Sequence, residues 1–344
     1  MTEIDIRPLN PLDSEMVDQW LDCFDASITA SLPGFPLFSR ASRVVQLTRK
    51  SSSMKQVHLV AMIDDKVVGS TEVSMPLLDN LHMAEFELEV HPDHRRRGVG
   101  TALYREVERV ARENDRRSLH IYVAGPLPGG GGQPRQEFAK AIAESAGFVD
   151  SLTEVRRVSD HEAVSPFDLD ELLADAWSKA EGYELRQWIN RTPEDLVDGI
   201  AYLDGRLLED APTGTLDIEP QRVDADRVNE RERNNLVRGQ LRLNTAVVHS
   251  ESGRVAGWTD IAVNSTEEYD AWQGITIVGP DDRGHRIGTI LKIENHRQLL
   301  RYRPQVRHVH TWNAAVNDHM ISINEAIGYR AVDAWTAYEK KLDA

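Results

Sequence analysis

The segment EFELEVHPDHRRRGVGT at residues 85–101 has a counterpart, QGITIVGPDDRGHRIGT, at residues 273–289. Aligned residues of the two segments are 188 positions apart, as Val90 and Val278 show. The upstream motifs DKVVG and GRVAG keep the same separation. A constant offset over several motifs predicts a duplicated domain, because solenoid units repeat every ~20–50 residues.

The offset falls to 181 residues downstream, where Gly147 aligns with Gly328. The first copy alone carries the loop GPLPGGGGQP at residues 125–134, which accounts for the difference. Its prolines favour a surface loop or lid over a second phosphate site. An acidic stretch with Pro166 separates the copies. We therefore expect domains at 1–160 and 183–344, joined by a linker at 161–182.

Composition limits the possible functions of the 344-residue chain. Its net charge of −16 disfavours nucleic acid as a partner and favours cationic small molecules. Cys23 is the only cysteine, and we expect it to be a small buried residue in the first helix. No apolar run approaches the ~18 residues of a membrane span. We expect a cytoplasmic protein without a membrane partner, either a monomer or a homodimer.

Residues 84–91 alternate between apolar side chains and acidic ones. This pattern predicts a strand with one buried face and one face that carries Glu85, Glu87 and Glu89. Helical spacing of apolar residues follows at 101–113. Each copy reads as strand, helix, hairpin, strand, helix, strand, helix and closing strands, which indicates a mixed α/β fold.

The junction between strand and helix predicts a phosphate site in each copy. Backbone N–H groups converge at the start of a helix, and Gly98 and Gly100 allow a ligand to approach them. Neither a Walker sequence nor a dinucleotide-binding fingerprint is present. His308 and His310 lack a third ligand nearby, so we expect no metal site.

With its motif Arg95-x-x-Gly98-x-Gly100, the first copy resembles the GNAT superfamily of N-acetyltransferases. The second copy has Arg283-x-x-Arg286-x-Gly288, with arginine where the first glycine is expected. The resemblance covers nearly the whole chain and is similar in plan to tandem acetyltransferases of the mycothiol synthase kind. It implies two tandem domains, each with a mostly antiparallel sheet and helices on both faces.

The resemblance implies that acetyl-CoA binds where the fourth and fifth strands part. In the first copy, the residues implied to contact it are Val90, Arg95, Arg96, Arg97, Gly98, Val99, Gly100 and Thr101. In the second copy, they are Val278, Arg283, Gly284, His285, Arg286, Ile287, Gly288, Thr289, Asn313 and Asn317. For Asn317 a role as a helix N-cap is equally consistent with the sequence.

Direct transfer to an amine needs a base and an acid. Glu87 and Glu89 are the candidate bases, although a solvated strand face explains them as well. The family's usual acid, a tyrosine, is replaced by Ala143 and Asn324 in the two copies. Tyr122 in the first copy is a possible substitute. The second copy offers Asn313 as its nearest catalytic candidate.

These features predict an N-acetyltransferase that moves an acetyl group from acetyl-CoA to a primary amine of a small molecule. The missing tyrosines leave a rival, in which the chain is a catalytically decayed acyl-CoA sensor or scaffold. The fuller loop and carboxylates favour the first copy as the active one. The polar residues around Asn313 and the mycothiol synthase resemblance favour the second, toward which the balance leans slightly.

Overall fold

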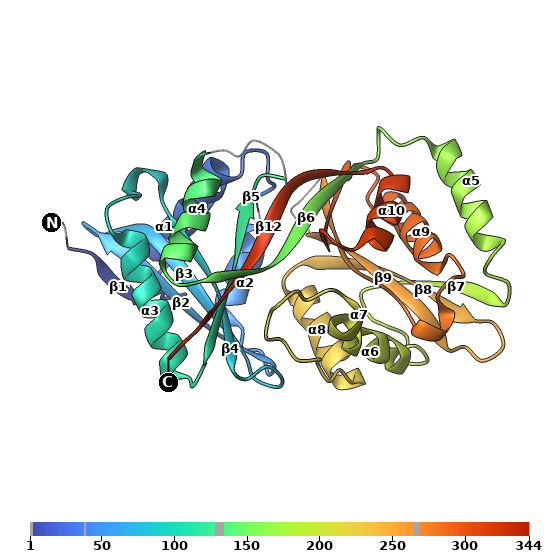
Figure 1. Cartoon of the computed structure of the whole chain (residues 1–344), viewed down its shortest axis with the longest axis horizontal. Helices are drawn as coiled ribbons and strands as arrows, with labels where there is room; N and C mark the ends of the chain where they lie inside the picture. The colour runs from blue at the N-terminus through green and yellow to red at the C-terminus, as the bar shows by residue number, and fades with distance from the viewer. Residues whose placement is uncertain (1–2, 38, 128–133, 265–268, 344) are drawn as a thin grey trace. The chain divides into compact units, whose positions relative to one another are not determined.

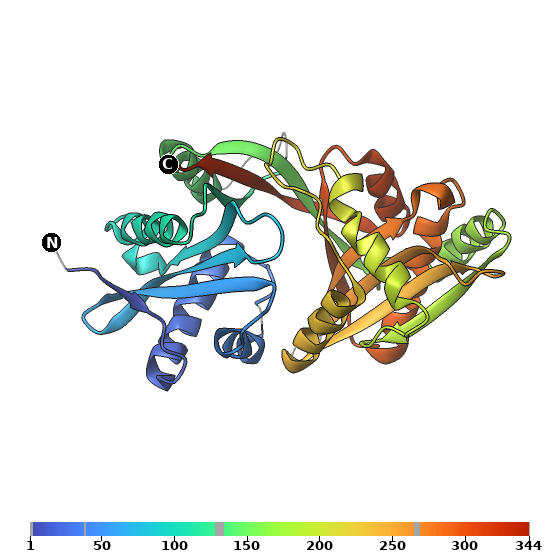
Figure 2. The ribbon, with the colours of Figure 1, turned by 90° about the horizontal axis from the view of Figure 1, so that it is seen from below.

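A computed structural model of the chain describes residues 3–37, 39–127, 134–264 and 269–343. The chain forms two compact units (Figures 1 and 2). The first unit contains Met1–Thr153, Thr213–Glu219 and Ala334–Ala344, and the second contains Glu154–Pro212 and Pro220–Asp333. Strand pairing within each unit is antiparallel except for one parallel pair, which confirms the predicted fold class.

The first unit has the sheet order β1-β2-β3-β4-β5-β12. Its first helix begins where the side chain of Asp13 accepts a hydrogen bond from the backbone N–H of Met16, a standard N-cap. Elements from the first copy are β1 (Asp5–Pro8), α1 (Ser14–Ser31), α2 (Arg40–Thr48), β2 (Met54–Ile63), β3 (Lys66–Pro76), β4 (Met83–Val90), the 3-10 turn η1 (Pro92–His94), α3 (Val99–Glu113), β5 (Ser118–Gly125) and α4 (Pro134–Ser145).

The second unit has the order β6-β11-β10-β9-β8-β7. Its elements are β6 (Val149–Asp160), α5 (Pro166–Trp177), β7 (Tyr183–Ile189), α6 (Val197–Gly205), α7 (Leu207–Asp210), α8 (Ala225–Val237), β8 (Gln240–His249), β9 (Val255–Asn264), β10 (Asp270–Val278), the 3-10 turn η2 (Pro280–Asp282), α9 (Ile287–Tyr302), β11 (His308–Ala314), α10 (Asp318–Ala326) and β12 (Tyr329–Lys341). The order of elements matches that of the first copy.

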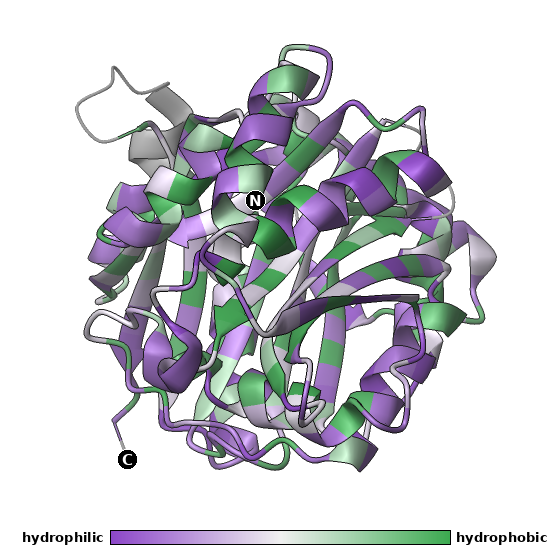
Figure 3. Ribbon diagram, turned by 90° about the vertical axis from the view of Figure 1, so that its right-hand side faces the viewer, coloured by the Kyte–Doolittle hydropathy of each residue, from purple (hydrophilic) through white to green (hydrophobic). Residues whose placement is uncertain are grey.

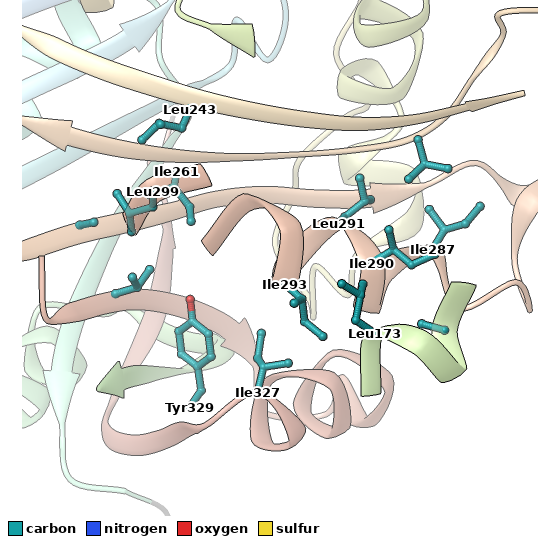
Figure 4. Packing of buried hydrophobic residues seen from close by; sticks show 14 of the residues in the cluster. Leu173, Leu243, Ile261, Ile287, Ile290, Leu291, Ile293, Leu299, Ile327 and Tyr329 are labelled. Atoms are coloured by element: carbon teal, nitrogen blue, oxygen red, sulfur yellow. The ribbon is translucent and has the colours of Figure 1, made fainter. Parts of the chain in front are cut away.

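Each sheet buries apolar side chains on both faces. In the first unit, Trp20 of α1 packs on the face that carries Val60, whereas Val107 of α3 packs on the face that carries Phe86. In the second unit, α6 and α8 cover one face, and α9 and α5 cover the other (Figure 4). Figure 3 shows hydrophobic and hydrophilic residues interspersed along the helices and strands of the chain. None of the helices in the described ranges has the length and apolar character that crossing a bilayer demands.

The closing strands are exchanged between the two copies. Residues 334–341 of β12 pair with β5 and complete the first sheet, whereas residues 154–160 of β6 pair with β11 and complete the second. The expected boundaries at 160 and 183 therefore differ from the compact units. The two strands occupy equivalent places in the repeat, and each completes the sheet of the other copy.

The segment expected as a linker, residues 161–182, is part of the second unit. Its helix α5 packs against α9, and Leu173 and Ala176 are buried in the core that these helices share. The segment packs against the unit because its apolar residues recur at helical spacing, and an amphipathic helix buries its apolar side.

A lysine is enclosed in the core of the second unit. Lys292 of α9 is 0% exposed, and its ammonium nitrogen lies 5.2 Å from the ring centroid of Tyr329. Within the described part of the chain, this nitrogen has no hydrogen-bond partner. Burial lowers the pKa of Lys292 to about 7, because the charged form loses its hydration.

We expect Lys292→Met to raise the free energy of unfolding by ~1–3 kcal/mol at neutral pH, because it removes a buried polar group without a partner. The folded-state pKa lies below that of the unfolded chain. Wild-type stability relative to the variant therefore falls as pH decreases from about 10 to 7. Urea denaturation at pH 7 and pH 9.5 measures this. A smaller gain at pH 7 than at pH 9.5 would contradict the assignment.

Candidate functional site

The two parallel strands part at the same place in both units. β4 and β5 pair in parallel over Met83–Glu85 and Ser118–His120, after which both strands run on without that pairing. β10 and β11 do the same after Trp272 and His310. Each unit therefore has a wedge between its parallel strands, as the family resemblance implied.

The junction after the wedge has one backbone conformation in both units. The first contains two left-handed residues, Arg96 (φ 64°) and Gly98 (φ 89°). The second contains Gly284 (φ 88°) and Arg286 (φ 56°) at the positions 188 residues later. Glycine occupies the second left-handed position in the first unit and the first left-handed position in the second unit. The arginine that departs from the family motif therefore leaves the course of the backbone intact.

Helices α3 and α9 begin directly after these left-handed residues. No side chain caps either helix start. The first N–H groups of a helix need partners from outside it, and together with the helix dipole they attract an anion. In the first unit Arg96, Arg97, Gly98 and Thr101 are exposed around this start. The junction can therefore accept a phosphate group.

Some predicted cofactor ligands hold the junction in place instead. The guanidinium of Arg95 donates to the carbonyl of Val90 (3.0 Å) and to the hydroxyls of Ser27 (2.9 Å) and Ser31 (3.0 Å). In the second unit, Arg283 forms an ion pair with Asp210 (3.1 Å). His285 contacts the carbonyl oxygen of Lys179 (3.0 Å).

A buried carboxylate anchors the second junction. Asp282 is 1% exposed and accepts hydrogen bonds from Arg254 (2.7 and 2.8 Å) and from the hydroxyl of Tyr183 (3.0 Å). His249 lies 2.9 Å from the same carboxylate. Burial opposes the charged form, but these hydrogen bonds hold the pKa of Asp282 below its usual range. Sequence reasoning missed this network, whose members come from three separate strands and loops.

The wedge of the second unit is covered at its helix start. A Cβ placed on Gly288 would lie 3.2 Å from Ile323 of α10, and both Gly288 and Thr289 are buried. Ile323 is 8% exposed, whereas Ile142, the residue 181 positions earlier, is 50% exposed. In the described part of the first unit a Cβ on Gly100 would meet only Val90 and Leu88 of β4, so α4 does not cover the start of α3 as α10 covers that of α9.

The asparagines of the second unit support α10. The side chain of Asn324 donates to that of Asn313, which lies on β11. Asn317 is the N-cap of α10 and accepts a hydrogen bond from the backbone N–H of Met320 (3.2 Å). Both predicted ligands are thus engaged in holding α10 against the wedge.

Strand pairing gathers the acidic residues of the first unit on one sheet face. Glu72 pairs with Glu87, Ser70 with Glu89, and Glu85 with His120. Paired residues project from the same side of a sheet. At the positions 188 residues later than Ser70, Glu87 and Glu89, the second unit has Trp258, Ile275 and Ile277, which belong to a closed apolar cluster. The acidic face is therefore a feature of the first unit.

Glu89 is linked to the junction through Ser27. The hydroxyl of Ser27 donates to Glu89 and accepts a hydrogen bond from Arg95. Burial raises the pKa of Glu89 to about 7, although Ser27 and the charges of Arg95 and Arg43 lower it. The pKa of Glu87 is raised by burial and by Glu72.

Glu85 is a weaker candidate than Glu89. The pKa of Glu85 is raised to about 7. Desolvation by the surrounding protein is the main cause, and the negative charges of Glu87 and Glu72 contribute less. Its side chain is nevertheless exposed, so water screens these effects. Glu89 is half-buried and hydrogen-bonded, which makes it the stronger candidate base.

Two other residues were singled out in the sequence. Tyr122 lies on β5 two positions after His120, on the acidic face, and is 37% exposed. Cys23 is buried in α1, as predicted. Burial raises its pKa to about 12, so it stays a protonated thiol.

A pocket opens on the acidic face of the first unit. Its lining includes Trp20 and Phe24 of α1, Arg43 of α2, His58 of β2 and Thr71 of β3, together with Ser70, Glu72, Glu87 and Glu89. Sequence reasoning missed Ser27, Arg43, His58 and Glu72. The alternation of β3 opposite the acidic strand could have revealed Glu72. Within the described ranges, no group of three or more His, Cys, Asp or Glu residues is arranged to hold a metal ion.

The acetyltransferase (GNAT) family model matches residues 20–126. A tandem GNAT protein from the clavulanic acid biosynthesis pathway is 28% identical, with a TM-score of 0.83 and 99% of each chain covered. A GCN5-related N-acetyltransferase from Sphaerobacter thermophilus is 15% identical, with a TM-score of 0.66, covering 98% of this chain and 95% of that one. A comparison with curated proteins finds no match.

The parted strands, the junctions and these similarities define an acyltransferase fold. Residues 20–126 match the acetyltransferase (GNAT) family, and the whole chain has the fold of a tandem GNAT protein, with one GNAT fold after the other.

We expect Arg286→Gly to stabilise the second unit by about 0.5–1 kcal/mol, because a left-handed conformation strains any residue with a Cβ. The matched control is Arg283→Gly, at φ −70°, which we expect to destabilise the unit. Differential scanning calorimetry measures both. Equal destabilisation by the two substitutions would show that Arg286 has another structural role.

Proposed function

We propose that the first unit transfers an acetyl group from acetyl-CoA to a primary amine of a small molecule, by direct attack of the amine on the thioester. The observation that carries this proposal is the acidic face of the first unit beside an open wedge. The second unit has the same backbone, but an apolar cluster and Ile323 of α10 fill the corresponding places.

The residues of the first junction suit the diphosphate of coenzyme A. The N–H groups of Val99, Gly100 and Thr101 and the side chains of Arg96 and Arg97 would hold the diphosphate, and the main chain of Val90 would contact the pantetheine arm. Acetyl-CoA supplies the activated acetyl group. In this proposal Arg95 positions the loop and contacts no phosphate.

Glu89 is the base in the proposed reaction. An aliphatic amine with a pKa of ~10 is mostly protonated at neutral pH, and it must lose its proton before it attacks a carbonyl carbon. A carboxylate whose pKa is about 7 is largely ionised at slightly alkaline pH and accepts protons better than an ordinary glutamate. Tyr122, on the parted strand β5, is the proposed donor of a proton to the departing thiolate.

In the second unit α10 covers the wedge, although the junction itself is kept. That junction is formed by Val278, Arg283, Gly284, His285, Arg286, Ile287, Gly288 and Thr289. We therefore expect one acetyl-CoA per chain by isothermal titration calorimetry. Replacing both Arg96 and Arg97 by Ala should weaken binding at least ~10-fold, because two charge-assisted contacts are lost. The matched control, Arg105→Ala on the exposed side of α3, should bind normally. Two equivalent sites per chain would contradict the proposal.

Replacing Glu89 by Gln should lower kcat/KM by about 10²–10⁴-fold, because glutamine accepts no proton. Activity of the wild type should rise with pH through about 7 as Glu89 ionises. Ser27→Ala removes a donor to the ionised form, so its profile should move to higher pH. Thiol release with a panel of amines measures these effects, and Glu85→Gln is the control. An unmoved profile in Ser27→Ala would exclude Glu89 as the base.

A further inference from the structure

We propose that the acceptor carries a second positive charge a few bonds from its reactive amine, and that Arg43 occupies the site of this charge until the acceptor displaces it. The inference rests on the proposed function, because it assigns the pocket of the first unit to the acceptor. The ligand class is a diamine, or an amine that bears a guanidinium group.

Carboxylates are in excess over cations in this pocket. Glu72, Glu87 and Glu89 line it, and Glu72 and Glu87 are directly paired across β3 and β4. Neutral groups supply the hydrogen bonds to two of them: Gln56 and Ser74 donate to Glu72, and Ser27 donates to Glu89. Arg43 faces all three carboxylates, and the charge of Arg95 acts on Glu89 as well, so three carboxylates are set against two cations. The remaining negative charge favours a cationic ligand.

The pocket also has the aromatic wall that a flat or methylene-linked cation needs. The guanidinium carbon of Arg43 lies 3.3 Å from the centroid of the Phe24 ring. Trp20 lies beside His58 on the same face, with the two ring centroids 6.5 Å apart. A cation over an aromatic ring gains energy from the ring quadrupole, most of all where water is excluded. Arg43 therefore shows the pose that a ligand cation would adopt.

Arg43 occupies the place over the aromatic wall. Its guanidinium carbon lies on the face of the Phe24 ring that a ligand cation would use. A ligand cation can take this place only if the side chain moves. Arginine has a long, flexible stem, so the guanidinium can swing away while α2 stays in place. Arg40 holds α2 to α1 independently, through Asp22 and Asp25 (both 2.8 Å).

The second unit shows the alternative arrangement. There Arg231 of α8 forms an ion pair with Asp204 of α6, and its guanidinium carbon lies 5.9 Å from the ring of Trp258. The acidic residue equivalent to Glu72 is Asp260, which is buried and paired with Arg242. Asp204 and Asp260 each form an ion pair with an arginine. The excess of carboxylates is therefore specific to the first unit.

Equilibrium binding to the full-length chain tests the proposal with three probes of similar length: 1,4-diaminobutane, butylamine and 4-aminobutyrate. Their far ends are cationic, neutral and anionic. We expect diaminobutane to bind at least ~10-fold more tightly than butylamine, and 4-aminobutyrate to bind most weakly. Similar affinities for all three probes would overturn the inference.

The role of Arg43 is tested by Arg43→Met, which removes the internal cation but keeps an unbranched side chain. We expect its affinity for diaminobutane to rise about 10-fold, with methylguanidine binding more tightly as well. The matched control is Arg40→Met, which loses the same charge outside the pocket and should bind as the wild type does. Unchanged or weaker diaminobutane binding in Arg43→Met, with Arg40→Met normal, would refute the displacement of Arg43.

Competition in the wild type gives a test that needs no variant. Methylguanidine should displace bound diaminobutane competitively, and failure to do so would count against a shared cation site. Thiol release from acetyl-CoA is measured separately with the same amines. Selective binding of diaminobutane without thiol release would support the cation site and contradict the proposed acetyl transfer. Thiol release with butylamine and 4-aminobutyrate but not with diaminobutane would support acetyl transfer and contradict the cation site.

Discussion

A pair of left-handed residues directs the chain at each strand-to-helix junction. Arg96 and Gly98 in the first unit, like Gly284 and Arg286 in the second, turn the backbone so that a helix begins without a side-chain cap beside the parted strands. The family motif is written in terms of glycine residues, but the property that the junction requires is the left-handed conformation. Glycine is only the residue that adopts this conformation most easily. At each junction of this chain, one of the two left-handed positions holds arginine and the other holds glycine.

On this common backbone, the two units differ in what their strands present to the helices that cover them. In the first unit, β3 and β4 carry carboxylates toward α1 and α2, and burial raises the pKa of Glu89 to about 7. In the second, Trp258 and Ile277 at the corresponding places join a closed apolar core. Burying carboxylates costs free energy that an apolar core avoids, so the first unit retains them at a cost to its stability. Such a cost is expected where charged groups serve binding or chemistry.

The sequence predicted the duplication, the acidic strand and the helix after each junction, because each depends on local periodicity or on a constant offset. It placed the domain boundaries wrongly relative to the compact units, since β6 and β12 are equivalent strands and no local pattern says which sheet each one completes. It also missed Arg43, which comes from a short helix with no counterpart in the motif and reaches the site only through tertiary packing. Contacts between residues that are far apart in the chain produce no periodic pattern that a single sequence could reveal.

The exchange of strands gives a physical reason why the second copy is retained. The sheet of the first unit is incomplete without residues 334–341, and without them β5 would expose a row of unpaired backbone groups. Residues 213–219 also belong to this unit: the backbone of Glu219 exchanges two hydrogen bonds with the side chain of Asn80 (2.7 and 3.0 Å). Two segments of the second copy are thus structural parts of the unit that carries the acidic face. A chain cut at residue 160 would lose both, so the first copy by itself lacks part of its own fold, and an active site in the first unit depends on the sequence of the second.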